Sequence, residues 1–118
     1  MPNFSDLSIR LLNTCHPDLI RLFTEVIKHW DCKVTDGHRG KAAQNSAYKD
    51  GRSEFEYPNS GHNKKPSLAI DVVPYPVDWE NRERFLLFRG RVYGVASQMN
   101  IKLKRTIDWD LPHYELTE

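Results

Sequence analysis

The chain has 118 residues and a formal net charge of +1, from 17 basic and 16 acidic side chains. This length predicts one domain over residues 1–118 with a single modest core. The balanced charge argues against a nucleic-acid-binding surface, and the 11% aromatic content argues against disorder. No stretch approaches the ~20 apolar residues of a membrane-spanning helix. The first residues, MPNFSDLSIR, lack the apolar core of a signal peptide, so we expect synthesis in the cytoplasm.

The first strong pattern along the chain predicts a helix from about Pro17 to Trp30. Proline suits the first helical position, and Asp18 is favourable in the first turn. A short strand from Cys32 to Thr35 is expected next, before an Asp-Gly turn. The apolar residues of the helix recur at helical spacing on one face: Leu19, Leu22, Phe23, Val26, Ile27 and Trp30.

A second helix is expected over residues Lys41 to Lys49, with Gly51 as its C-terminal stop. Residues 53–65 are polar and predict a loop. The alternation over Ser67 to Val73 predicts a strand, with Ile70 and Asp71 on opposite faces.

A longer helix is expected over about Asp78 to Met99. Gly90 and Gly94 weaken it by up to ~1 kcal/mol each relative to alanine, so they predict either close packing or a break. Two short alternating segments, Ile101 to Leu103 and Tyr114 to Leu116, are expected to close a small antiparallel sheet. The order of elements predicts an α+β fold in which that sheet packs with helices.

The two cysteines match no zinc-finger or redox spacing. Cys15 and Cys32 are separated by 16 residues, and neither belongs to a C-x-x-C pair. Two reduced thiols are the expectation for a protein made in the cytoplasm, and a single disulfide is the alternative.

Three short motifs contain residue types that bind zinc. S-G-H ends at His62, A-I-D ends at Asp71, and D-L-P-H runs from Asp110 to His113. Two histidines and one aspartate supply three ligands and leave a fourth position open for water, as in catalytic zinc sites. Asp110 is then a candidate base for that water. Each motif alone also fits a surface histidine, a turn aspartate or a loop histidine.

Taken together in this order, the motifs resemble the D-Ala-D-Ala-type zinc peptidases. That family includes VanX- and VanY-like enzymes and, most similar here, the phage L-alanyl-D-glutamate endolysins. The run D-G-H-R ending at Arg39, followed by Gln44, Tyr48 and the G-R-S that begins at Gly51, also resembles the family's arginine-containing turn and helix. The likeness covers about residues 17–116.

The resemblance implies a LAS/hedgehog-type zinc peptidase fold and roles for individual residues. It makes His62, Asp71 and His113 the ligands of one zinc ion and Asp110 the general base. Arg39 matches the family's arginine that contacts substrate near the reacting carbonyl. Ser60 is a candidate substrate-binding residue, although its main expected role is to orient its loop.

Alternatives remain for several of these roles. Asp108 or Glu115 could be the base in place of Asp110, and Arg39 could pair with a structural carboxylate. The stretch of eight residues between the first two ligands is longer than is common in the family. The segment at 104–109 is shorter than in relatives, which puts the substrate subsites in doubt.

The expected function is that of a zinc-dependent endopeptidase of the peptidoglycan stem peptide. The resemblance implies cleavage at L-alanyl-D-glutamate by zinc-activated water. The alternatives are a D-alanyl-D-alanine carboxypeptidase or dipeptidase, and a non-catalytic module that binds zinc or the cell wall. We expect a monomer whose partner is bacterial peptidoglycan, made in the host cytoplasm and released through a holin pore.

Overall fold

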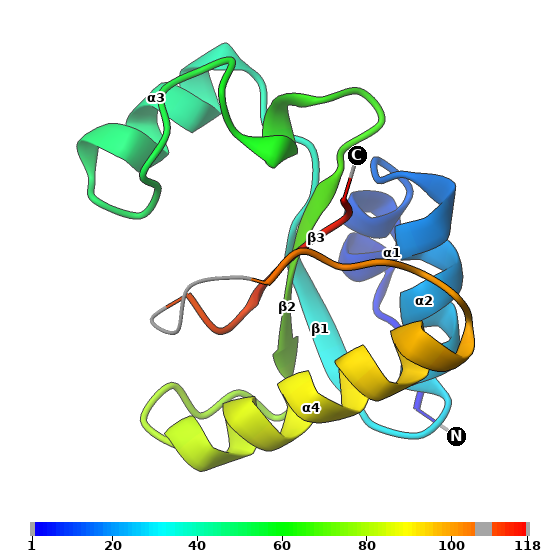
Figure 1. Ribbon diagram of the computed structural model, residues 1–118. Coiled ribbons are helices and arrows are strands. Elements are labelled where there is room, and N and C mark those ends of the chain that lie inside the picture. Colours follow the sequence, from blue (N-terminus) through cyan, green and yellow to red (C-terminus); the bar gives the residue numbers. More distant parts are fainter. Residues whose placement is uncertain (1, 106–109, 118) are drawn as a thin grey trace.

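The computed structural model describes residues 2–105 and 110–117 and has an α+β fold. A three-stranded antiparallel sheet has the order β1-β2-β3, with β2 in the centre. In Figure 1, α1 and α2 lie on one side of the sheet, α4 runs past one end of it, and α3 stands apart at the other end. The elements in chain order are α1 (Asp6–Leu12), α2 (Pro17–Ile27), β1 (Cys32–Asp36), α3 (Lys41–Lys49), the 3-10 turn η1 (Gly61–Asn63), β2 (Ala69–Pro74), α4 (Arg82–Gln98) and β3 (His113–Glu115).

Helices α2 and α3 follow from local signals. His16 caps α2, since its Nδ1 accepts a hydrogen bond from the backbone N–H of Asp18 at 3.0 Å, and Pro17 takes the first helical position. The helix ends at Ile27, three residues before the predicted end, and a turn leads into β1. Helix α3 has the predicted bounds, and Gly51 beyond it takes a φ of +78°, in the left-handed region that glycine favours.

Helix α1 was not predicted from the sequence. It has only seven residues, and Leu7 and Ile9 are exposed, so no apolar stripe marks it. The signal that could have revealed it is Ser5, whose Oγ accepts a hydrogen bond from the backbone N–H of Ser8. The Oγ of Ser8 in turn accepts from the N–H of Val34 at 3.1 Å, which ties α1 to β1.

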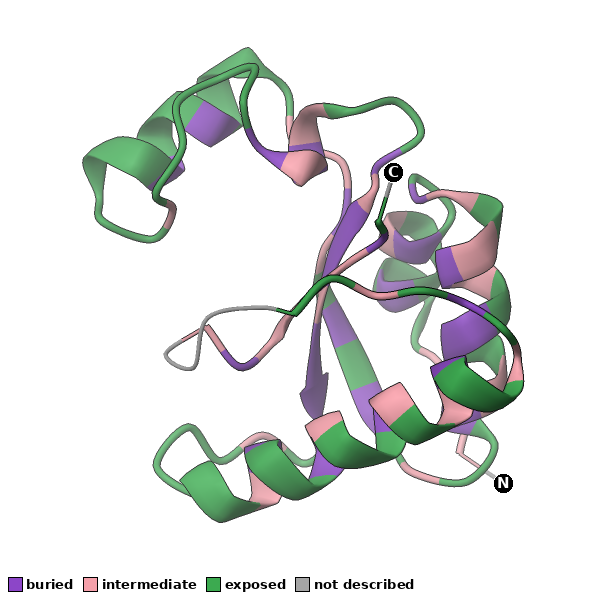
Figure 2. Ribbon diagram, in the orientation of Figure 1, coloured by how far each residue is buried: buried purple, intermediate pink, exposed green. Residues whose placement is uncertain are grey.

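The core lies between the sheet and α2 and α4. Phe23 of α2 packs edge-to-face on Tyr114 of β3, with ring centroids 5.4 Å apart. Strand β2 is buried along both faces, and only Asp71 within it is partly exposed. Figure 2 shows buried positions along β1, β2 and the inner sides of α2 and α4, whereas α3 is mostly exposed. Asp71, the charged and partly exposed residue of this otherwise buried strand, is the candidate ligand that the sequence indicated.

The remaining boundaries differ in part from the sequence prediction. The segment from Ile101 to Leu103 forms no strand, and only Leu103 makes an isolated bridge, to Leu116. Both cysteines are buried, and no disulfide joins them in the structure. None of the helices in the described part of the chain is long and apolar enough to cross a membrane.

Helix α4 begins at Arg82 rather than Asp78, because residues before it form a turn. Asn81 caps the helix through its side-chain oxygen, which accepts from the N–H of Arg84 at 3.1 Å. Gly90 and Gly94 neither break the helix nor allow close packing. Both are exposed, and a Cβ added at either would meet no atom within 4 Å.

Replacing Gly90 or Gly94 by alanine should therefore stabilise the protein. The gain expected for each is about 0.5–1 kcal/mol, since alanine loses less backbone entropy in a helix interior. Thermal denaturation of the single variants and the double variant measures this effect. A loss of stability would show that a Cβ at these positions is not accommodated.

Candidate metal centre

The fold brings the three candidate ligands together from three elements. His62 lies in η1, Asp71 in the central strand β2, and His113 at the start of β3, directly opposite Asp71 in the antiparallel register. The N–H of Leu68 donates to the carbonyl of Gly61, which places η1 beside the start of β2. One ligand atom from each of the three side chains lies within 4.8 Å of the other two.

The protonation of the His62 ring follows from its surroundings. Its Nδ1 lies 2.6 Å from the carbonyl oxygen of Gly37, which can only accept, so Nδ1 carries a proton and donates. Its buried Nε2 makes no hydrogen bond and faces Asp71 Oδ1 at 3.3 Å. The lone pair of Nε2 therefore points at the negatively charged Asp71 carboxylate. The two repel each other unless a proton or a metal cation lies between them. Imidazole and carboxylate are ligands that suit zinc.

His113 has carboxylates on both sides of its ring. Its Nδ1 lies 3.2 Å from Asp71 Oδ1, and its Nε2 lies 2.9 Å from Glu115 Oε1. Burial lowers the pKa of His113, but the contacts with Asp71 and Glu115 outweigh burial and raise it to about 9. Burial raises the pKa of Glu115, but His113 and Lys104 outweigh burial and lower it to about 2. In the metal-free protein, His113 therefore carries a proton on Nδ1, between the ring and Asp71, where a metal cation would otherwise bind.

The contact of Glu115 with His113 should make the stability of the metal-free protein depend on pH in a predictable way. The contribution of His113 is full below about pH 6.5 and is lost as the pH rises through about 9, since its folded pKa is raised. The contribution of Glu115 is full above about pH 4.5 and is lost as the pH falls through about 2, since its folded pKa is lowered.

Chelator-treated wild type and E115Q are therefore expected to differ most in melting temperature between about pH 4.5 and 6.5. The difference should shrink toward both extremes of pH. A difference that grows between pH 6.5 and 9 would contradict this assignment of charges.

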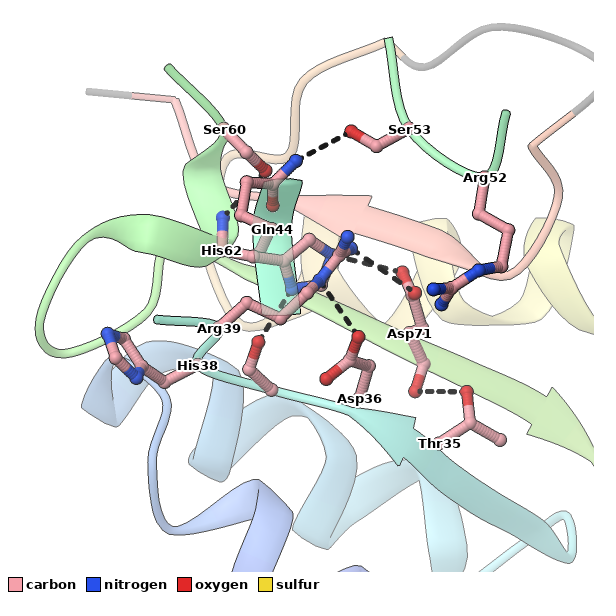
Figure 3. Close-up of polar contacts among 12 residues, drawn as sticks. Thr35, Asp36, His38, Arg39, Gln44, Arg52, Ser53, Ser60, His62 and Asp71 are labelled. Carbon is pink, nitrogen blue, oxygen red and sulfur yellow. Dashed lines mark hydrogen bonds and ion pairs between the residues drawn. The ribbon is translucent and has the colours of Figure 1, made fainter. Parts of the chain in front are cut away.

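Arg39 lies in the cleft beside the candidate ligands. Its Nε is 2.9 Å from Asp36 Oδ2, and one terminal nitrogen is 3.9 Å from Asp71 Oδ2. Figure 3 shows Arg39 and His62 directed toward Asp71, with Asp36 beside the guanidinium. The side chain is 11% exposed. Arg39 therefore both pairs with a structural carboxylate and faces the site, and its partner Asp36 was not singled out from the sequence.

Ser60 orients the turn that carries His62. Its Oγ accepts from the N–H of His62 at 3.2 Å, while Asn63 Oδ1 accepts from the N–H of Ser60 at 3.0 Å. This reciprocal capping box fixes η1. Gln44 is buried behind it and donates to Ser53 Oγ and to the carbonyl of Phe55. Gln44 therefore holds Ser53 and Phe55 beside the turn that carries His62.

The candidate ligands open into a cleft that Asp110 also lines. Burial and then the negative charge of Asp71 raise the pKa of Asp110. The basic residues Arg52, Lys104 and Arg105 also line the cleft, which local sequence patterns do not indicate because Arg52 meets the other two only in the fold. Asp108 and Trp109 lie outside the described residues. The cleft is lined by Arg39, Arg52, Ser53, Glu54, Phe55, Ser60, His62, Asp71, Lys104, Arg105, Asp110, His113 and Glu115.

Comparison with known proteins agrees with this site. The sequence model of the phage L-alanyl-D-glutamate peptidase family matches residues 2–115. The chain belongs to this family. Its fold is also similar to a solved structure of the Serratia marcescens L-Ala D-Glu endopeptidase ChiX, with a TM-score of 0.79 and 25% sequence identity over 98% of this chain and 90% of that one. No curated protein matches the sequence. The resemblance noted from the motifs is confirmed, and the chain is a peptidase of this family.

Proposed function

We propose that this protein is a zinc-dependent endopeptidase that cleaves the L-alanyl-D-glutamate bond of the peptidoglycan stem peptide. The observation that carries the proposal is the convergence of His62, Asp71 and His113 in a cleft shared with Asp110 and Arg39. Membership in the phage peptidase family and the likeness to ChiX support the choice of bond.

The donor set favours zinc over other common ions. Two imidazoles and one carboxylate match the three protein ligands of catalytic zinc sites, whereas calcium and magnesium prefer oxygen ligands throughout. Zinc held there supplies Lewis acidity, which lowers the pKa of water and polarises a peptide carbonyl. His62 would bind through Nε2 and His113 through Nδ1, because their other ring nitrogens face Gly37 and Glu115.

Asp110 and Arg39 would carry the proton transfer and the charge stabilisation. The carboxylate of Asp110 accepts a proton from the attacking water and passes it to the leaving amine. Its raised pKa makes it a better base than an ordinary aspartate. The pairing of Arg39 with Asp36 holds its guanidinium beside the site, where it can stabilise the oxygen of the scissile carbonyl.

Mass spectrometry of purified peptidoglycan treated with zinc-loaded protein tests the proposal, beside a chelated control. Fragments with new L-alanine C-termini and D-glutamate N-termini are expected only with zinc. Release of D-alanine would move the protein to the carboxypeptidase alternative. Absence of any zinc-dependent fragment, from folded and metal-bound protein, would overturn the proposal. The monomeric state and the release through a holin pore stay predictions.

A further inference from the structure

Glu115 links a candidate metal ligand to a lysine. One carboxylate oxygen lies 2.9 Å from Nε2 of His113, and the other lies 2.8 Å from Nζ of Lys104. The Glu115 side chain is 16% exposed, so solvent competes little for it. Both of its oxygens are engaged, and the carboxylate therefore has a single defined orientation behind the ring of His113.

Lys104 is held next to Glu115 by the backbone as well as by charge. Its N–H donates to the carbonyl of Glu115 at 2.7 Å, and the neighbouring residues Leu103 and Leu116 form a bridge. The Lys104 side chain is half-exposed, and exposed ion pairs contribute little to stability. The pair thus has more effect on where the carboxylate lies than on how stable the fold is.

Gly61 provides the space that the Glu115 carboxylate occupies. A Cβ atom at residue 61 would lie 2.6 Å from Glu115 Cδ and 2.8 Å from each of its carboxylate oxygens. These separations are far below van der Waals contact, so any side chain at residue 61 would displace the carboxylate. The absence of a side chain at Gly61, next to His62 in the sequence, is therefore what leaves room for Glu115 behind His113.

We infer that Glu115, held by Lys104 in the space left by Gly61, is a positioning residue of the metal centre that fixes the His113 ring with its proton on Nε2 and its Nδ1 toward the metal. The inference rests on the metal centre of the proposed function. Carboxylates behind ligating histidines commonly orient the ring and increase its basicity. Glu115 therefore acts through His113 and does not take the proton from the attacking water.

Zinc affinity, measured by competition with a chromogenic chelator, tests this role without reference to activity. E115A should bind zinc about 10–100-fold more weakly than wild type, as is typical when a residue behind a ligand is lost. E115Q should lose less, because its amide oxygen can still accept from His113. The comparison is made over a series of pH values, since Glu115 also favours the protonated His113 that competes with zinc.

The chain offers a matched control on the surface of α2. Glu25 also lies between a histidine and a lysine, 3.1 Å from Nε2 of His29 and 3.4 Å from Nζ of Lys28. E25A and E25Q remove a similar pair of contacts away from the cleft. They should leave zinc affinity unchanged.

A double-mutant cycle separates positioning from a general structural role. G61A should weaken zinc binding in the wild type because it displaces Glu115, but it should cost nothing further in E115A. Additive losses would indicate that Gly61 acts independently of Glu115.

The position of the His113 proton is measured by NMR. The long-range ¹H–¹⁵N spectrum of the zinc-loaded wild type should show the proton on Nε2, protected from exchange, and E115A should lose that protection.

The outcomes that overturn the inference are distinct from failure of the proposed function. If E115A and G61A bind zinc as tightly as wild type, or if His113 carries its proton on Nδ1, Glu115 is not a positioning residue. If only the melting temperature of the metal-free variants falls, its role is structural. Wild type that binds no zinc would overturn the metal centre and this inference with it.

Discussion

Replacing Asp110 by asparagine is expected to slow peptide cleavage by about 10²–10⁴-fold, the usual contribution of a general acid–base group. Asparagine has nearly the same shape but cannot take up a proton. Asp110 lines the cleft and is not among the three converging ligands, so the variant should still bind zinc. The measurement is the rate of fragment release from peptidoglycan, with zinc content determined on the same sample.

The matched control is D18N, which changes an exposed aspartate of α2 paired with Arg21. It should cleave at the wild-type rate. If D110N cleaves as fast as wild type, Asp110 is not the base, and Asp108 becomes the next candidate. Glu115 is not the alternative, because its carboxylate is already engaged by His113 and Lys104. If D110N loses zinc, Asp110 belongs to the metal site instead.

Replacing Asp71 by asparagine should weaken zinc binding by more than about 100-fold, the upper end of the loss seen for residues behind a ligand, and abolish cleavage. Asp71 Oδ1 lies 3.3 Å from Nε2 of His62 and 3.2 Å from Nδ1 of His113, so both rings face this one carboxylate. The neutral amide removes the negative charge that balances the cation. Chelator competition measures the affinity, and the peptidoglycan assay measures cleavage.

Removal of the metal from wild type should reproduce the catalytic defect of D71N. Chelator should abolish cleavage by wild type, and added zinc should restore it. The same treatment should change nothing in D71N. A D71N protein that binds zinc with wild-type affinity would show that the metal lies elsewhere in the molecule.

Local patterns in the sequence were sufficient for several elements of the fold. Pro17 and the apolar stripe after it marked α2, and Gly51 marked the end of α3. These signals act over a few neighbouring residues, so they survive without knowledge of the fold. Helix α1 was missed for the same reason, since its contacts are with β1 and two of its four apolar residues, Leu7 and Ile9, are exposed.

The order of short motifs identified the family, but no motif by itself did so. S-G-H and A-I-D are short enough to recur by chance, and it is their order along one chain with D-L-P-H that is specific. That order predicted His62, Asp71 and His113 as the candidate ligands. The family match over residues 2–115 is consistent with it.

The sequence by itself determined the identity of the candidate ligands, the family and the helices with strong local signals. Only the tertiary structure decided how the side chains meet. The register of β2 and β3 sets His113 opposite Asp71, and the carbonyl of Gly37 selects Nε2 of His62 as the atom that faces the carboxylate. The space that Gly61 leaves for Glu115 is likewise visible only in the tertiary structure. Each of these contacts joins segments far apart in the chain, and periodicity and spacing report only on residues that are near neighbours in sequence.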